Sequence, residues 1–144
     1  MTAVAVLQEK SIRQWYKEVY WLTVGADAVE AQLRLLQGTF CTQLTGKSMS
    51  RDDTLAKSAP ELQEMLVAAM ATKQKALVVL DDPWTPEQAS FLNPTGSSQT
   101  AHRLLITTRV RDLVPKATRV ELPLMGEDEA VALLLDLANV EEAS

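Results

Sequence analysis

The sequence of 144 residues has a single cysteine, Cys41, a single histidine, His102, and no apolar run long enough to cross a membrane. One cysteine excludes an internal disulfide framework and fits a reducing compartment, so we expect a cytoplasmic location. We expect Cys41 to pack as a small apolar residue and His102 to lie on the surface. The opening MTAVAVLQEK lacks the basic region and continuous apolar stretch of a secretory signal. The sequence therefore predicts no membrane partner.

The chain also lacks an excess of positive charge. It has 14 Lys and Arg residues against 19 Asp and Glu residues, which gives a net charge of −5. A nucleic-acid binder normally presents a basic face, so we expect no nucleic-acid partner. Hydrophobic residues make up 47% of the chain and charged residues 23%, which is typical of a globular protein. The length fits one domain with a real core.

Two apolar stretches of strand type end in polar residues. Residues 75–84, KALVVLDDPW, run into Asp81 and Asp82, and residues 102–109, HRLLITTR, end in Thr-Thr-Arg. Taken alone, the aspartates fit an acidic turn after a buried strand, because Asp-Asp-Pro favours turns. The carboxyl end of a buried strand is also where an open α/β sheet places magnesium and phosphate chemistry. The second stretch favours the latter interpretation.

Patterns along the rest of the chain predict alternating helices and strands. The expected helices cover residues 2–16, a segment capped by Asp27, a segment opened by the capping-box pattern Ser58–Glu61, a short segment from Pro86, and a segment after Gly126. The expected strands cover residues 18–24, 76–80, 103–108 and 119–122, and the expected loops cover 45–57 and 93–101. Such alternation predicts an α/β fold, a three-layer mostly parallel sheet with helices on both faces.

The segments occur in an order that resembles a known family. Residues 19–25 (VYWLTVG), 75–84 and 102–109 resemble three successive strands of the NB-ARC domain of STAND-class P-loop ATPases. Residues 120–138 (VELPLMGEDEAVALLLDLA) resemble its last strand and the following helix. That class includes plant disease-resistance proteins and apoptotic protease-activating factors. The resemblance implies that residues 1–144 form a partial NB-ARC nucleotide-binding domain with a P-loop NTPase-like fold.

The resemblance also implies site residues and cofactors. Asp81 would hold Mg²⁺ through water and contact the nucleotide, and Asp82 would polarise the attacking water as the catalytic group. Arg109 would sense the γ-phosphate of ATP, and Thr108 beside it would also contact ADP or ATP. These types suit the chemistry, because carboxylates hold hard cations and a guanidinium meets phosphate in a fork. The alternatives are a solvated turn and a surface ion pair. Pro83 departs from the apolar residue of many members, which puts the role of Asp82 in question.

One family motif is missing. Family members carry the phosphate loop GxxxxGK[ST] just before the helix that here begins at Met1, and its backbone N–H groups and lysine grip the phosphates. Gly46-Lys47-Ser48 does not supply it, because the position that requires the first glycine is Cys41 and the triplet follows a helix. The strand that leads into the loop would also be absent. We therefore expect a segment of a larger protein or a truncated gene model, lacking the first, phosphate-loop strand of the fold.

The leading hypothesis is the ADP/ATP-binding core of a STAND-type signalling switch. In the family, ADP holds a closed state, exchange for ATP permits oligomerisation, and slow hydrolysis resets the switch. Without a phosphate loop, we expect impaired ADP binding and no ATPase activity of this chain alone. Protein partners would act through flanking domains or self-association, and defence signalling is an inference by analogy. The alternative is a non-enzymatic protein-interaction fragment or degenerate scaffold. A third alternative, an AAA+ module, would be expected to have Asp-Glu at positions 81 and 82.

Overall fold

The computed structural model describes residues 8–96 and 101–138. The strands are β1 (Glu18–Thr23), β2 (Ala76–Asp81) and β3 (Arg103–Thr107). The helices are α2 (Lys10–Trp15), α3 (Glu30–Thr45), α4 (Arg51–Leu55), α5 (Ala59–Ala71), α6 (Pro86–Phe91) and α7 (Glu127–Leu137). None of the helices within these two ranges is long and apolar enough to cross a membrane.

The strands form a three-stranded parallel sheet in the order β1-β2-β3. Strand β2 lies in the centre, and its residues from Ala76 to Leu80 are all buried, as expected for a parallel strand that is covered on both faces. The register aligns Thr23 with Asp81 on one side and Asp81 with Thr107 on the other. The carboxyl ends of all three strands therefore meet at one edge of the sheet. The predicted α/β class and parallel sheet are confirmed.

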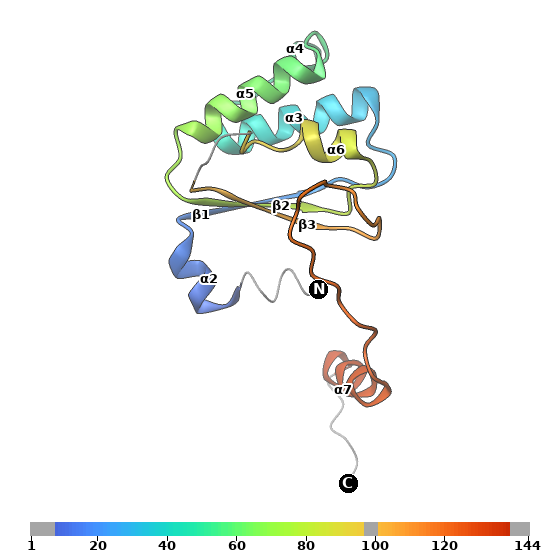
Figure 1. The fold of residues 1–144 in the computed structure, drawn as a ribbon. Helices are drawn as coiled ribbons and strands as arrows, with labels where there is room; N and C mark the ends of the chain where they lie inside the picture. Colours follow the sequence, from blue (N-terminus) through green and yellow to red (C-terminus); the bar gives the residue numbers. More distant parts are fainter. Residues whose placement is uncertain (1–7, 97–100, 139–144) are drawn as a thin grey trace.

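A layer of helices covers one face of the sheet. Figure 1 shows α3, α4, α5 and α6 together on that side, with α2 on the opposite side near the start of β1. Helices α3 and α5 pack against each other and, with the sheet, enclose the core. The buried core residues are Leu22, Leu33, Phe40, Cys41, Leu44, Leu66, Met70, Ala76, Val78, Leu80 and Leu92. The predicted packing of Cys41 is confirmed, and burial raises the pKa of its thiol.

The capping pattern that predicts α5 is present as expected. The Ser58 hydroxyl accepts a hydrogen bond from the backbone N–H of Glu61 at 3.4 Å, and the Glu61 carboxylate accepts one from the backbone N–H of Ser58 at 2.7 Å. Helix α6 begins with the same arrangement between Thr85 and Gln88. Both helices therefore start where their sequences satisfy the first free N–H groups.

Two helix predictions need correction. Helix α3 does not begin at an Asp27 cap. Its N-cap is Val29, without a side-chain hydrogen bond. The carbonyl of Asp27 instead accepts a bond from the Val29 N–H in a turn, 2.9 Å apart. The expected loop 45–57 contains α4, which is short and polar, and Ser50 caps it through the Asp53 N–H.

Two further expectations differ from the structure. Residues 119–122 are not a strand, and Val120 and Leu122 are exposed, because the chain leaves the sheet after β3 (Figure 1) and this segment pairs with none of the three strands. His102 is buried and not on the surface. Its Nδ1 accepts a hydrogen bond from the Ala76 N–H at 3.1 Å, which satisfies the ring in the interior. In α2, Trp15 is exposed, with the Lys75 ammonium 4.1 Å from its ring centroid. Residues 2–7 of the predicted first helix and residues 97–100 of the predicted loop lie outside the described residues.

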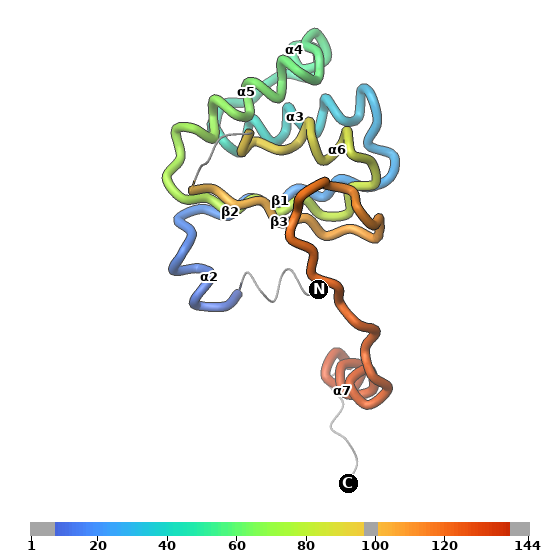
Figure 2. Tube along the Cα trace, in the orientation of Figure 1, coloured from blue at the N-terminus to red at the C-terminus, as the bar shows by residue number. Residues whose placement is uncertain are grey.

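The C-terminal segment, residues 117–138, follows a different course from the rest of the chain. Figures 1 and 2 show it leaving the carboxyl edge of the sheet and ending in α7, away from the other helices. Helix α7 has no buried residue. The acids in its first turn, Glu127 to Glu129, lie at the positive end of the helix as predicted. The segment therefore forms its helix without joining the core.

Candidate functional site

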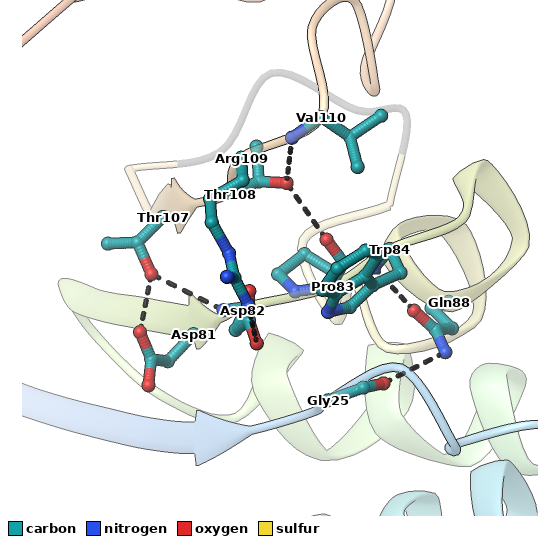
Figure 3. A network of polar contacts seen from close by, with 10 residues as sticks. All are labelled: Gly25, Asp81, Asp82, Pro83, Trp84, Gln88, Thr107, Thr108, Arg109 and Val110. Atoms are coloured by element: carbon teal, nitrogen blue, oxygen red, sulfur yellow. Dashed lines mark hydrogen bonds and ion pairs between the residues drawn. The ribbon is translucent and has the colours of Figure 1, made fainter.

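Asp81 ends the central strand and is held by the neighbouring strand. The hydroxyl of Thr107 donates a hydrogen bond to Asp81 Oδ1 at 2.5 Å. The register explains the contact, because Thr107 lies opposite Asp81 in the β2–β3 pairing. Figure 3 shows the carboxylate at the carboxyl end of β2. Asp81 thus lies where the sequence predicts, with its orientation fixed by a residue that the sequence analysis did not single out.

Asp82 lies in a strained turn that both neighbouring strands support. Its φ is 58°, in the left-handed region that non-glycine residues rarely adopt. Its N–H donates to the Thr107 carbonyl at 2.8 Å, and its own carbonyl accepts from the Gly25 N–H at 3.0 Å. A residue held in this way costs on the order of 1–3 kcal/mol and persists only when its surroundings impose it. The turn is therefore stabilised by β1 and β3, and such strain is often found at functional sites.

Arg109 folds back over this turn. Its Nη2 lies 3.5 Å from Asp82 Oδ2, and its guanidinium lies 4.9 Å from the centroid of the Trp84 ring. Figure 3 shows the side chain running toward Asp82 beside Trp84. The Arg109 side chain is 75% exposed and that of Asp82 is 36% exposed, so each contact is worth only about 0.2–1 kcal/mol. Arg109 is therefore held loosely. The Trp84 ring is partly exposed and contacts the Arg109 guanidinium.

Thr108 has a local structural role. Its hydroxyl donates to the Pro83 carbonyl at 2.9 Å and accepts from the Val110 N–H at 3.0 Å. These bonds join the end of β3 to the turn that carries Asp82. The predicted contact of Thr108 with nucleotide would have to compete with them.

Gln88 is a second residue that the sequence analysis missed. It is 1% exposed and joins two loops (Figure 3). Its Oε1 accepts from the N–H groups of Trp84 and Thr85, and its Nε2 donates to the carbonyls of Gly25 and Ala28. The spacing Thr85-Pro86-Glu87-Gln88 is a capping-box pattern that could have identified it. The bonds to Gly25 and Ala28 depend on the fold and have no local signal.

The site offers few metal ligands of its own. Within residues 8–96 and 101–138, no group of three or more His, Cys, Asp or Glu side chains could hold a metal ion. Mg²⁺ keeps several waters and uses one or two carboxylates together with substrate phosphates. A single carboxylate, with about four lone-pair positions of which the Thr107 hydroxyl occupies one, fits that requirement. Asp81 could therefore accept a magnesium-bound water without losing its bond to Thr107.

A parallel α/β sheet whose central strand ends in paired aspartates, with an arginine after the next strand, is consistent with a P-loop NTPase-like fold. The chain belongs to the NB-ARC family, because the family model of the NB-ARC domain matches residues 2–144. A comparison with curated proteins finds no match. The family consists of nucleotide-binding signalling switches, so the resemblance described above is confirmed. The roles of Asp81, Asp82, Thr108 and Arg109 remain predictions.

Proposed function

We propose that this domain is the ADP/ATP-binding core of a STAND-type signalling switch and uses Mg²⁺ with the nucleotide. The observation that carries the proposal is the meeting of Asp81, Asp82 and Arg109 at the carboxyl edge of the sheet, within a chain of the NB-ARC family. By analogy with the family, the switch would act in the cytoplasm, in a process such as defence signalling. Its protein partners would bind through flanking domains or by self-association.

The residues of the site support a division of roles. Asp81 would orient magnesium-bound water, and the metal would supply positive charge against the phosphates. The Arg109 side chain would move away from Asp82 and Trp84 and bind the γ-phosphate. A guanidinium binds a phosphate more strongly than it binds a single exposed carboxylate. The same movement would release the Asp82 carboxylate to polarise a water. ATP and ADP would then differ in whether Arg109 is drawn away, which is the differential contact that a switch requires.

We expect this chain to bind nucleotide weakly. It contains no GxxxxGK[ST] motif, and that motif supplies the backbone N–H groups and the lysine that grip the phosphates. We therefore expect ADP affinity below that of a family member with the motif, and no measurable ATP turnover by the chain alone.

Thermal unfolding with and without millimolar ADP and Mg²⁺ tests the proposal. A ligand that binds only the folded state stabilises it by about 2.7 kcal/mol at a hundred times its Kd. We expect a rise in the midpoint for the wild type and a smaller rise for Asp81→Asn. Asp136→Asn removes the same charge from exposed α7 and should respond like the wild type. A wild type without any rise, under conditions where it unfolds cooperatively, would contradict nucleotide binding.

A second candidate function is a non-enzymatic interaction fragment. It is favoured by the exposed apolar side chains of the C-terminal segment, including Leu124, Leu134 and Leu137, and by β3, which pairs only with β2 among the described residues. Exposed apolar patches and strand edges are common binding surfaces. Sedimentation at increasing concentration distinguishes the two functions. A scaffold would associate with or without ADP and would be unaffected by Asp81→Asn.

A further inference from the structure

We infer that Gln88 is a positioning residue of the nucleotide site, which ties the Asp82–Trp84 turn to the loop Gly25–Ala28 after β1. The inference rests on the proposed function, because its consequence for a ligand exists only if the turn serves one. Its structural part, the joining of the two loops, stands on the hydrogen bonds of Gln88.

The side-chain amide of Gln88 joins the two loops through four hydrogen bonds. On one side, Oε1 lies 2.6 Å from the Trp84 nitrogen and 3.2 Å from the Thr85 nitrogen. On the other side, Nε2 lies 3.1 Å from the Gly25 oxygen and 2.9 Å from the Ala28 oxygen. The side chain is 1% exposed, so water does not compete for these partners. A buried amide with every bond satisfied holds its neighbours in one arrangement.

The contacts of Gln88 lead directly to the charged residues of the site. The Trp84 N–H that it holds belongs to the residue whose ring supports the Arg109 guanidinium. Gly25, whose carbonyl it also holds, donates its N–H to the Asp82 carbonyl. Asp82 has the strained φ of 58°. Gln88 therefore orients Arg109 through Trp84 and Asp82 through Gly25.

Only a carboxamide can make both sets of bonds at this position. Position 88 needs an acceptor toward Trp84 and Thr85 and a donor toward Gly25 and Ala28. A glutamate has the same shape and keeps the acceptor, but when ionised it cannot donate. A methionine has similar length and makes neither bond. Gln88→Glu thus removes only the bonds to Gly25 and Ala28, whereas Gln88→Met removes the bonds to both loops.

The test compares Gln88→Glu and Gln88→Met with the control Gln63→Glu in the full chain. Gln63 lies on α5 and donates a hydrogen bond to the Ser90 carbonyl of α6 at 2.8 Å, a bond that reaches neither loop. The first measurement is the affinity for ATP and for ADP, each with Mg²⁺. Because Gln88 orients Asp82 and Arg109, and Arg109 is the proposed sensor of the γ-phosphate, we expect Gln88→Glu to lose about tenfold of the affinity gained from the γ-phosphate, the loss expected when one hydrogen bond to a charged group is weakened. ADP affinity should change little, and Gln63→Glu should match the wild type.

The second measurement is backbone amide exchange without nucleotide. In Gln88→Glu we expect the amides of Gly25 and Asp82 to exchange faster relative to that of Val78, in the middle of β2. A purely structural role would accelerate all three amides together and lower the affinities for ATP and ADP equally. In the wild type, the side-chain amide of Gln88 should itself exchange slowly, a measurement that needs no variant.

The outcomes separate the two hypotheses. A wild type that does not bind ADP overturns the proposed function and the ligand part of the inference. A wild type that binds ADP, together with a Gln88→Glu variant that matches Gln63→Glu in both measurements, overturns the inference alone. If Gln88→Glu does not fold, Gln88→Met is read in the same way. Fast exchange of the Gln88 side-chain amide in the wild type also overturns it.

Discussion

The body of the domain, residues 18–113, and its C-terminal segment, residues 117–138, both contain apolar stretches but differ in packing. In the body, Val78 and Leu80 of β2 are completely buried. In the C-terminal segment, Val120 is 79% exposed and Leu124 is 99% exposed. Both stretches are rich in apolar residues, but β2 is a continuous run (ALVVL), whereas residues 120–124 (VELPL) alternate and include Pro123, which cannot donate to a strand ladder. The difference teaches that apolar residues alone do not place a segment in the sheet.

The helices of the two regions repeat this contrast. Helices α5 and α7 each have a glutamate in their first turn that accepts a hydrogen bond from the N-cap N–H. The distance is 2.7 Å for Glu61 and 3.1 Å for Glu129. Helix α5 then buries Leu62, Leu66 and Met70 against α3 and the sheet. Helix α7 buries none of its residues. Local sequence therefore determines that each helix forms, and tertiary contacts determine whether it contributes to stability.

The largest expected effect distinguishes the two regions by side-chain truncation. Leu80→Ala should lower the free energy of unfolding by about 2–5 kcal/mol, because it leaves a cavity in a fully buried position. Leu122→Ala, the same change in the exposed C-terminal segment, should change it by less than about 0.5 kcal/mol. Urea denaturation followed by circular dichroism measures both. Equal effects would show that the C-terminal segment packs in solution.

A smaller effect is expected for the two surface arginines. Arg109→Ala should lower stability by at most about 1 kcal/mol, since its ion pair and its contact with Trp84 are exposed. It should also remove the preference between ATP and ADP, if Arg109 senses the γ-phosphate. Arg119→Ala loses ion pairs with Asp112 and Glu121 at the start of the C-terminal segment. We expect no change in nucleotide preference there.

Isothermal titration with ATP and with ADP measures this preference. Because Trp84 lies against Arg109, its fluorescence should change in Arg109→Ala and remain as in the wild type in Arg119→Ala. An Arg109→Ala variant that keeps the wild-type ratio of the two affinities would contradict the proposed role of Arg109.

Much of the fold could be predicted from the sequence because its signals are local. The strands β1, β2 and β3, the capping box of α5 and the start of α6 follow from apolar runs and cap residues. The meeting of Asp81, Asp82 and Arg109 at one edge also follows, since parallel strands end together. The sequence could not show that the N–H of Ala76 donates a hydrogen bond to Nδ1 of His102. That contact depends on the relative placement of two strands.

The sequence pointed to the charged residues of the candidate site, but it did not point to the neutral residues Thr107 and Gln88. Thr107 lies opposite Asp81 only because of the β2–β3 register, and Gln88 reaches Gly25 and Ala28 across 63 and 60 positions of sequence. Neither contact has a signature in the residues around it. The contact between Arg109 and Trp84 likewise depends on the path of the chain after β3. The charged residues of the candidate site can be recognised in the sequence by their residue type. The neutral residues that orient them can be identified only from the structure.

The smallest expected effect concerns the pH dependence of the two capping glutamates. The backbone N–H of Ser58 stabilises the Glu61 carboxylate and lowers its pKa in the folded state. A carboxyl group with a lowered pKa adds stability above its unfolded pKa, and this contribution is lost as pH falls through the folded value. Glu61→Gln should therefore flatten the acid side of the stability curve slightly. Glu129→Gln changes the corresponding residue of α7, which buries nothing, so global stability should keep its wild-type pH dependence. Thermal unfolding between neutral pH and about pH 3 measures both variants, since ordinary carboxyl groups titrate in that range. A flattened curve in Glu129→Gln would mean that α7 is coupled to the unfolding of the body after all.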